Sequence, residues 1–248
     1  MNFYRSFSRL VMTACLLAVT LPAGAAGSGN ADEWQYDAAI YVWGASMEVK
    51  PDQGDTLKMS FNDIIDNLDF TFMGALNARK DKWSLLWDVI YMKLSDDMNG
   101  SIDNSIRAKL DVEMKAWIVT LAGGYTLVDT GKYSLELLGG GRYLSVDVPV
   151  KFEIDQQKQK VSPSRSGWDG ILGVRGKVDL ADKWYMSYYL DGGTGDSDST
   201  WQGIVGLNYQ FKKLDAGFGY RYLNFNINSD QIDDLTIKGP YAGVRFLF

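Results

Sequence analysis

The sequence predicts an all-β protein built as a single antiparallel barrel of ten strands. Three observations predict it. Apolar and polar residues alternate with a period of two along most of the chain, as in strands with one apolar and one polar face. Short polar turns alternate with longer polar stretches. The chain also stops on Phe248 within an alternating segment, where pairing with the first strand would leave no open edge.

Residues 1–26 have the features of a secretory signal peptide. Two arginines supply a positive start, an apolar stretch follows, and residues 23–26 are the small side chains of a cleavage site. We expect cleavage there, which leaves residues 27–248 as the barrel domain. A retained membrane anchor is the alternative, but the apolar stretch is short for a spanning helix.

The mature chain is acidic. Removing the two signal arginines leaves 23 of the 25 basic residues against 31 acidic ones, a net charge of −8. This balance disfavours nucleic acid as a partner. No run of eighteen apolar residues remains, so we expect no membrane helix. The single cysteine, Cys15, lies in the signal, and no disulfide or thiolate metal site is expected.

Four short polar turns lie at residues 79–82, 130–132, 181–183 and 211–213. An aromatic residue follows three of them directly: Trp83, Tyr133 and Trp184. Aromatic residues at strand ends are typical of the boundary between lipid and water, so these three are predicted interfacial residues. The longer polar stretches are predicted loops on the other side, at residues 51–67, 95–106, 149–167, 194–199 and 229–234.

The segments between these turns and loops predict ten strands, an even number that places both chain ends on the short-turn side. The expected bounds are residues 34–49, 68–79, 83–94, 107–126, 133–148, 168–180, 184–193, 200–211, 214–227 and 235–248. Eight strands are the alternative, if the first or ninth segment is divided wrongly. The alternation is clear in six strands. In the first and fourth strands, the sequence does not show which residues belong to which face.

Periodicity alone does not say which face lies inside. A soluble lipocalin-like barrel would hold its apolar face inward, and a membrane barrel reverses this arrangement. Two features favour the membrane barrel: the polar faces carry glycine and serine beside their charges, and aromatic residues gather at strand ends. The predicted lumen-lining residues are then Asp88, Glu136, Arg142, Arg175, Lys177, Asp191, Asn208, Arg221 and Arg245.

The last ten residues carry the most specific motif. Phe248, Phe246 and Val244 share one face of the final strand. This ending resembles the C-terminal signature strand of bacterial outer-membrane β-barrels, in which a terminal phenylalanine and alternating apolar residues are read by the insertion machinery. The resemblance implies a transmembrane barrel in the outer membrane, with periplasmic turns and extracellular loops. It also implies contact with membrane lipid, lipopolysaccharide and the barrel-assembly machinery.

The chain contains no histidine. The enzymatic outer-membrane barrels, among them omptin proteases, lipid A deacylases and palmitoyltransferases and the outer-membrane phospholipase, use a histidine as general base or orienting group. None of their sites can be carried onto this chain, and we expect no enzyme. Asp88, Glu136 and Asp191 could pair for acid–base catalysis, but basic residues share their face. We expect ion pairs instead, with Glu136 beside Lys177 and Arg175 beside Asp191.

No metal or cofactor site is expected. Residues 191–198 and 96–100 are rich in Asp and Gly, but neither segment has the spacing of a calcium loop. Residues 139–141 are three glycines without the following helix and lysine of a phosphate loop, and we expect them to relieve crowding in a curved strand.

Residues 60–68 break the period of two. Ser60 and Asp63 have the spacing of a capping box, and four apolar residues share one helical face. The expectation is a single helical turn within the first extracellular loop. The alternative is that its apolar face folds over the barrel mouth and restricts entry.

Together these features predict a non-enzymatic barrel that acts as a narrow porin-like channel for ions or very small polar solutes. Ten strands lie near the closed end of the range, because eight-stranded barrels are filled by side chains and open aqueous channels need about sixteen strands. The alternative is a surface-binding or structural barrel whose loops contact lipopolysaccharide, a host surface or another protein, without transport.

Overall fold

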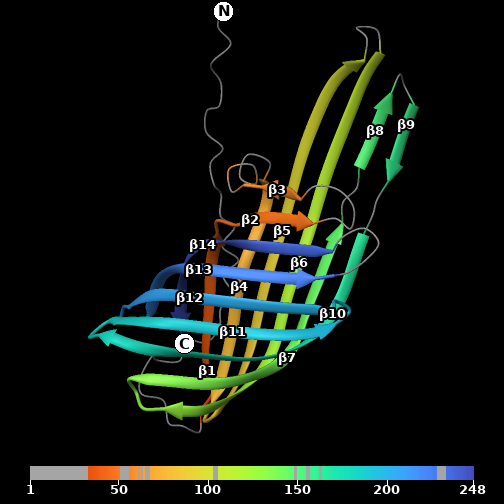
Figure 1. Ribbon diagram of the computed structural model, residues 1–248. Helices are drawn as coiled ribbons and strands as arrows, with labels where there is room; N and C mark the ends of the chain where they lie inside the picture. Colours follow the sequence, from red (N-terminus) through yellow and green to blue (C-terminus); the bar gives the residue numbers. More distant parts are fainter. Residues whose placement is uncertain are drawn as a thin grey trace, which may run out of the picture.

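The sheet closes on itself as a barrel (Figure 1). This computed structural model describes residues 33–50, 56–60, 62, 64, 68–102, 106–147, 150–154, 157–161, 164–227 and 233–248. The ten antiparallel wall strands are, in order around the barrel, β1 (Gln35–Trp43), β4 (Leu68–Lys80), β5 (Trp83–Ile102), β6 (Ile106–Asp129), β7 (Tyr133–Asp147), β10 (Ser164–Ala181), β11 (Trp184–Gly195), β12 (Ser199–Gln210), β13 (Leu214–Asn226) and β14 (Asp234–Leu247). The prediction of ten strands rather than eight is confirmed, whereas the predicted signal peptide lies outside the described residues.

Strand β14 closes the barrel, because it pairs with β13 on one side and with β1 on the other. The same register continues into β2 (Ser46–Lys50): Trp43 lies opposite Tyr241, and Ser46 lies opposite Lys238. β1 and β2 are therefore one long strand interrupted at residues 44–45, close to the predicted bounds. A short strand, β3 (Leu57–Met59), pairs with β2. Closure gives the wall strands a hydrogen-bonding partner on each side, which a lipid environment requires.

Two wall strands, β5 and β6, rise well beyond the others (Figure 1). They stay paired up to Ile102 and Ile106, and the far part of β6 also pairs with β8 (Val150–Ile154), which pairs with β9 (Gln157–Val161). We call these four paired segments the strand extension. The prediction that residues 95–106 and 149–167 are loops is therefore wrong over most of their length. Antiparallel strands in water tolerate polar residues, so polar sequence there does not mark the end of pairing.

Every wall strand exposes a large apolar side chain on the outside of the barrel. One such residue from each strand is Ile40, Phe72, Leu85, Leu121, Leu137, Leu172, Leu190, Val205, Phe218 and Val244. An apolar band around the whole perimeter is far larger than the apolar patches that soluble proteins expose, and it suits the hydrocarbon of a bilayer. The fold is thus a transmembrane β-barrel of the outer-membrane type.

Aromatic pairs mark both edges of this band. At the short-turn edge, Trp83 packs against Tyr125 and Trp184 against Tyr209, with ring centroids 4.9 and 5.0 Å apart. The predicted interfacial residues Trp83, Tyr133 and Trp184 are each exposed at the first position of their strand. The long-loop edge carries a second set that the sequence analysis did not identify: Tyr91 with Trp117, Tyr143 with Trp168, and Trp201 with Tyr222.

Charged contacts begin beyond the aromatic edges. On the long-loop side, Lys238 Nζ lies 3.0 Å from Glu48 Oε1, and this hydrogen bond lowers the pKa of the Glu48 carboxyl. On the short-turn side, Lys82 Nζ lies 6.0 Å from the centroid of the Tyr125 ring. The apolar band is therefore bounded by charge on both sides, as at the two surfaces of a membrane. Among the described residues, no helix is long and apolar enough to cross a membrane.

Candidate functional site in the barrel lumen

The lumen next to the short turns is a chamber of about 410 Å³. The charged residues that line it are Asp37, Arg79, Glu136, Arg175, Lys177, Asp215 and Arg245. The side chain of Lys177 is 42% exposed, whereas those of Arg175 and Glu136, two residues farther from the short turns, are 16% and 4% exposed. The chamber is therefore open at the short-turn end, which faces the periplasm in an outer-membrane barrel, and closes toward the long loops.

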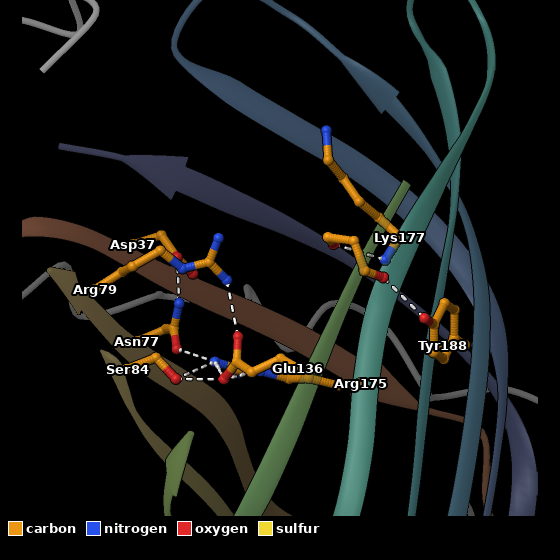
Figure 2. Close-up of polar contacts among 9 residues, drawn as sticks. Asp37, Asn77, Arg79, Ser84, Glu136, Arg175, Lys177 and Tyr188 are labelled. Atoms are coloured by element: carbon orange, nitrogen blue, oxygen red, sulfur yellow. Dashed lines mark hydrogen bonds and ion pairs between the residues drawn. The ribbon is translucent and has the colours of Figure 1, made fainter. Parts of the chain in front are cut away.

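Glu136 binds two arginines inside the chamber (Figure 2). Its Oε2 lies 3.0 Å from Arg79 Nη2, and its Oε1 lies 2.9 Å from Arg175 Nη2. Arg175 Nη2 also donates to Asn77 Oδ1 at 2.8 Å, and Asn77 Nδ2 donates to Asp37 Oδ2 at 2.9 Å. The two cations compensate the desolvation of the Glu136 carboxylate, which would otherwise be costly.

The sheet register explains why a carboxylate fits at this height. Arg175 lies directly opposite Glu136 on the neighbouring strand. On strand β6, a Cβ added at Gly124 would overlap Glu136 Oε1 and Ser84 Oγ, so only glycine leaves room for both groups. Ser84 then donates to the same Oε1 atom. Glycine within a strand often marks such a close approach.

A second carboxylate, Asp215 on β13, forms a separate group in the chamber. It forms an ion pair with Arg245, its register partner on β14. Tyr185 Oη donates to Asp215 Oδ2 at 2.7 Å, and Arg245 Nη2 donates to Tyr185 Oη at 3.0 Å. Only 2% of Asp215 is exposed. The chamber therefore has two compensated carboxylates, one on β7 and one on β13.

Above the chamber lies a level that we call the buried polar layer: Tyr41, Asp88, Thr120, Arg142, Asp191, Thr200, Gln202 and Arg221. Arg221 is at its centre and is 2% exposed. Its Nη2 donates to Asp88 Oδ1 at 2.8 Å, its Nη1 to Tyr41 Oη at 2.8 Å and its Nε to Gln202 Oε1 at 2.8 Å. These partners come from β1, β5 and β12, so one guanidinium links strands across the lumen.

Arg142 completes the buried polar layer from β7. It is fully buried and forms an ion pair with Asp191 on β11. It also donates to Thr120 Oγ1 and Thr200 Oγ1, at 3.3 Å each. The layer thus draws polar side chains from seven of the ten wall strands and fills the cross-section of the lumen at this height.

Above the buried polar layer is the apolar cluster: Trp43, Ala45, Met47, Ile64, Met73, Ile90, Met92, Leu94, Ile118, Leu144, Leu223, Phe225, Ile227, Leu235 and Ile237. The guanidinium of Arg221 lies 5.1 Å from the Trp43 ring centroid, where the two levels meet. The predicted lumen-lining residues are all polar, so this apolar level of the lumen was not predicted. The cluster begins at the height of the long-loop aromatic edge, where Ile90 and Ile118 are neighbours of Tyr91 and Trp117, and it continues beyond that edge as an apolar core.

Ile64 belongs to this cluster and is 4% exposed. Its backbone N–H donates to the Ser60 carbonyl oxygen at 3.0 Å, as in one helical turn. Both interpretations of residues 60–68 therefore hold in part: the turn exists, and its Ile64 side chain is buried inside the barrel mouth. The other residues of the predicted apolar helical face lie outside the residues whose side chains are described.

The predicted lumen residues fall on two levels. Glu136, Arg175, Lys177, Asn208 and Arg245 line the chamber, while Asp88, Arg142, Asp191 and Arg221 belong to the buried polar layer. Both predicted ion pairs are wrong. Glu136 contacts Arg79 and Arg175, and Lys177 Nζ instead lies 3.3 Å from Asp179 Oδ1. Asp191 contacts Arg142.

These two errors have a common cause. Each predicted ion pair joined two residues that lie at similar distances from the short turns along their own strands. Strands in a barrel are tilted and staggered, so equal distances along two strands do not give equal heights or facing positions. The register pairs Glu136 with Arg175 and Asp215 with Arg245, and neither relation follows from turn counting alone.

Several important residues were not predicted. Tyr41 and Thr120 lie on the first and fourth strands, whose phase the sequence did not reveal. In the structure, Tyr41 shares the inward side of β1 with Trp43, and Thr120 shares that of β6 with Ile118. Gln202 lies on the same strand face as the predicted lumen residue Asn208, but it carries no charge that would single it out. The sequence signal that could have identified Gln202 is a polar residue in the middle of a strand.

In the Asp- and Gly-rich residues 191–198, Asp191 faces the lumen, whereas Asp196 and Ser197 form loop contacts. Asp196 Oδ2 accepts a hydrogen bond from the Trp168 backbone N–H at 2.7 Å. Asp169 accepts hydrogen bonds from the backbone N–H and the hydroxyl of Ser197, at 2.9 and 2.5 Å. These carboxylates therefore order the connection between β11 and β12. Within the described residues, no group of three or more potential ligands could hold a metal ion.

Solved structures with a similar fold are outer-membrane barrels. The translocator domain of the autotransporter NalP from Neisseria meningitidis has a TM-score of 0.45 and 12% identity, over 88% of this chain and 89% of that chain. The outer membrane protease OmpT from Escherichia coli has a TM-score of 0.47 and 12% identity, over 88% and 98%. Ail, the attachment invasion locus protein of Yersinia pestis, has a TM-score of 0.36 and 14% identity, over 88% and 99%.

No protein-family model matches the chain, and no curated protein matches its sequence. The similarity to the solved structures is low and concerns architecture. The assignment to outer-membrane-type barrels rests on the closed sheet and on the apolar band around it.

Proposed function

We propose that this protein is a non-enzymatic barrel of the bacterial outer membrane that does not conduct and that acts through its extracellular surface. The observation that carries the proposal is the filled lumen. Arg142 and Arg221 are buried within polar contacts, and the apolar cluster lies directly above them. Passage of an ion would require breaking buried ion pairs and wetting an apolar core, and both are costly.

The strand extension supports a surface role. Its outer strands are β5 and β9, and within the described residues the part of β5 beyond Leu94 pairs only with β6, and β9 pairs only with β8. Exposed strand edges present unpaired backbone groups that can pair with another chain. We therefore expect contacts with a protein or with lipopolysaccharide to involve this extension.

The location and the assembly partner are part of the same proposal. Residues 1–26 would direct export, and the apolar band would contact membrane lipid with lipopolysaccharide in the outer leaflet. The final strand, with Val244, Phe246 and Phe248 exposed on its outer face, would be read by the barrel-assembly machinery. The absence of histidine from the whole chain supports the non-enzymatic role.

A narrow channel is the second candidate function. The open chamber favours it, because four basic and three acidic residues line a polar space inside the lumen. Conduction would then require the buried polar layer and the Ile64 segment to move.

Planar-bilayer recording separates the two candidates. We expect the purified, folded protein to give no single-channel steps under conditions in which a general porin conducts. Steps that change in size when Arg221 or Arg175 is replaced by Ala would establish the channel and reject the closed barrel. Steps that are insensitive to both replacements would point to a contaminating porin, which a preparation from a porin-deficient strain removes.

A further inference from the structure

The outer face of the barrel has a groove of about 740 Å³ where the sheet closes on itself. The residues that line it come from β1, β11, β12, β13, β14 and the turn after β12. Trp184, Phe211 and Phe218 line it and are 41%, 50% and 59% exposed. Within the described part of the chain, no charged residue lines the groove. It therefore belongs to the apolar band and opens toward lipid.

Two alanines on the outward side of their strands leave this space. Ala216 lies beside Val244 in the sheet register, and Ala242 lies between Phe218 and Val42. A methyl group beside longer outward side chains leaves a hollow that the protein itself does not fill. An empty hollow loses dispersion contacts, and a flexible acyl chain can adapt to its shape and restore them.

The groove lies in the half of the apolar band next to the short turns. Trp184 and Tyr209, which line it, form an aromatic pair of the short-turn edge. On β13, the lining residue Phe218 lies two outward positions before Tyr222 of the long-loop edge. In the proposed outer-membrane orientation, this half of the band contacts the acyl chains of the periplasmic leaflet. Phospholipid is therefore the lipid at this depth, because lipopolysaccharide lies in the outer leaflet.

Lysines lie at the short-turn end of the groove. Lys212 and Lys213 are in the turn after β12, and both are exposed. Lys183 is exposed in the turn before β11, and its Nζ lies 6.0 Å from the centroid of the Tyr209 ring. Against these three lysines, residues 181–183 and 211–213 contain one acidic residue, Asp182. Positive charge therefore prevails at the depth of the lipid headgroups, where basic residues attract anionic lipid.

We infer that the groove binds one anionic phospholipid of the periplasmic leaflet, with an acyl chain against Ala216 and Ala242 and the phosphate near Lys183, Lys212 and Lys213. The volume of the groove falls within the usual range of small-molecule sites. The inference rests on the proposed outer-membrane location, which places the short turns in the periplasm. It does not depend on whether the lumen conducts.

The test measures lipid binding to the full-length mature protein, folded in detergent micelles, by native mass spectrometry. The probes are phosphatidylglycerol, which is anionic, and phosphatidylcholine with the same acyl chains, which has no net charge. We expect the first phosphatidylglycerol to bind at least about fivefold more tightly than phosphatidylcholine, because the lysines attract its charge. Equal affinities for the two lipids would overturn the inference.

A matched pair of substitutions locates the acyl chain. Ala242→Phe should fill the groove without removing a polar contact and weaken phosphatidylglycerol binding about tenfold. Ala78 also faces outward, opposite the exposed Leu85, but it does not line the groove. Ala78→Phe should therefore change the affinity less than about twofold. Equal affinities in the two variants would place the lipid elsewhere on the barrel and reject the inference.

A charge-matched pair of double variants tests the headgroup contact. Lys212→Gln with Lys213→Gln removes two charges beside the groove and should reduce the preference for phosphatidylglycerol to about twofold or less. Lys82→Gln with Lys132→Gln removes the same charge from the other two short turns and should leave the preference unchanged. An equal loss in both double variants would mean that the preference reflects the overall charge of the short-turn side, and would reject the site.

Fold, oligomeric state and conduction are checked on the same preparations. Heat-modifiable migration on a detergent gel shows that each variant is folded. A dimer of the unsubstituted protein that Ala242→Phe dissociates would assign the groove to a second copy and reject the lipid. Selective lipid binding together with single-channel steps retains the groove and rejects the closed barrel, whereas silent recordings without selective binding do the reverse.

Discussion

Arg221 on β13 and Asp88 on β5, separated by 133 residues in sequence, meet inside the lumen with Nη2 and Oδ1 2.8 Å apart. Tyr41 bridges them: its hydroxyl donates to Asp88 Oδ2 at 2.6 Å and accepts from Arg221 Nη1 at 2.8 Å. This triad joins three strands and lies where the polar chamber gives way to the apolar cluster.

The first prediction concerns this ion pair. Asp88→Ala leaves the Arg221 guanidinium buried without a counter-charge, and removal of one partner of a buried pair typically costs about 3–5 kcal/mol. We expect a loss of that size in the free energy of unfolding, measured by urea titration of the protein in lipid vesicles.

Asp179→Ala is the control, because it removes the exposed partner of Lys177 and should cost less than about 1 kcal/mol. If the two variants lose the same stability, water reaches Arg221 and the polar layer is not closed.

The second prediction concerns the apolar cluster. Phe225 is fully buried, so Phe225→Ala should leave a cavity and cost about 3–5 kcal/mol. Phe218 lies on the same strand but faces outward, where lipid chains can fill the space left by Phe218→Ala, and the loss should be smaller. Equilibrium unfolding compares the two. A larger loss for Phe218→Ala would mean that the upper lumen is wet.

The third prediction concerns a close approach between strands. A Cβ added at Gly219 would overlap the Val205 carbonyl oxygen of the neighbouring strand, so Gly219→Ala should force a backbone shift and cost about 1–3 kcal/mol. A Cβ at Gly123 would have no atom closer than 3.9 Å, and Gly123→Ala should be nearly neutral. The measurement is the folded fraction of each variant after refolding into vesicles, read from heat-modifiable migration on a gel. Full refolding of the Gly219 variant would contradict the register of β12 and β13.

The fourth prediction concerns the strand extension. Replacing residues 97–111 by a two-residue turn removes the end of the β5–β6 hairpin, where Asp97 lies opposite Asp111. The chamber and the buried polar layer lie elsewhere. The deletion removes the hairpin end and most of the pairing of β6 with β8, so the free energy of unfolding should change by no more than about 1 kcal/mol. Heat-modifiable migration and urea unfolding check this. Failure of the shortened chain to fold would show that the extension takes part in barrel formation.

Most of the barrel wall was predictable because it depends on local sequence. Turns such as residues 81–82 and 131–132, followed by Trp83 and Tyr133, fix where strands begin. Their bounds agree with the structure within a few residues on the short-turn side. On the long-loop side the bounds of β11 to β14 agree equally well, whereas that of β5 does not. This strand continues, paired with β6, through polar sequence that gives no signal to stop or to continue.

The inward position of Glu136, Arg175 and Arg221 likewise follows from alternation, since side chains on a strand point to opposite faces in turn. The residues that these three side chains contact do not follow from alternation. Whether Arg221 meets Asp88 or another carboxylate depends on the tilt and stagger of ten strands, which are set by closure of the whole sheet.

The amino-acid sequence by itself determined the number of wall strands, the apolar band and the end of the barrel that carries the short turns, because turn chemistry and a period of two are local properties of the chain. The tertiary structure alone decided that the lumen is filled above a polar chamber. That outcome depends on which side chains from distant strands share one height, and closure of the barrel brings Arg142, Arg221 and the apolar cluster into the same narrow space.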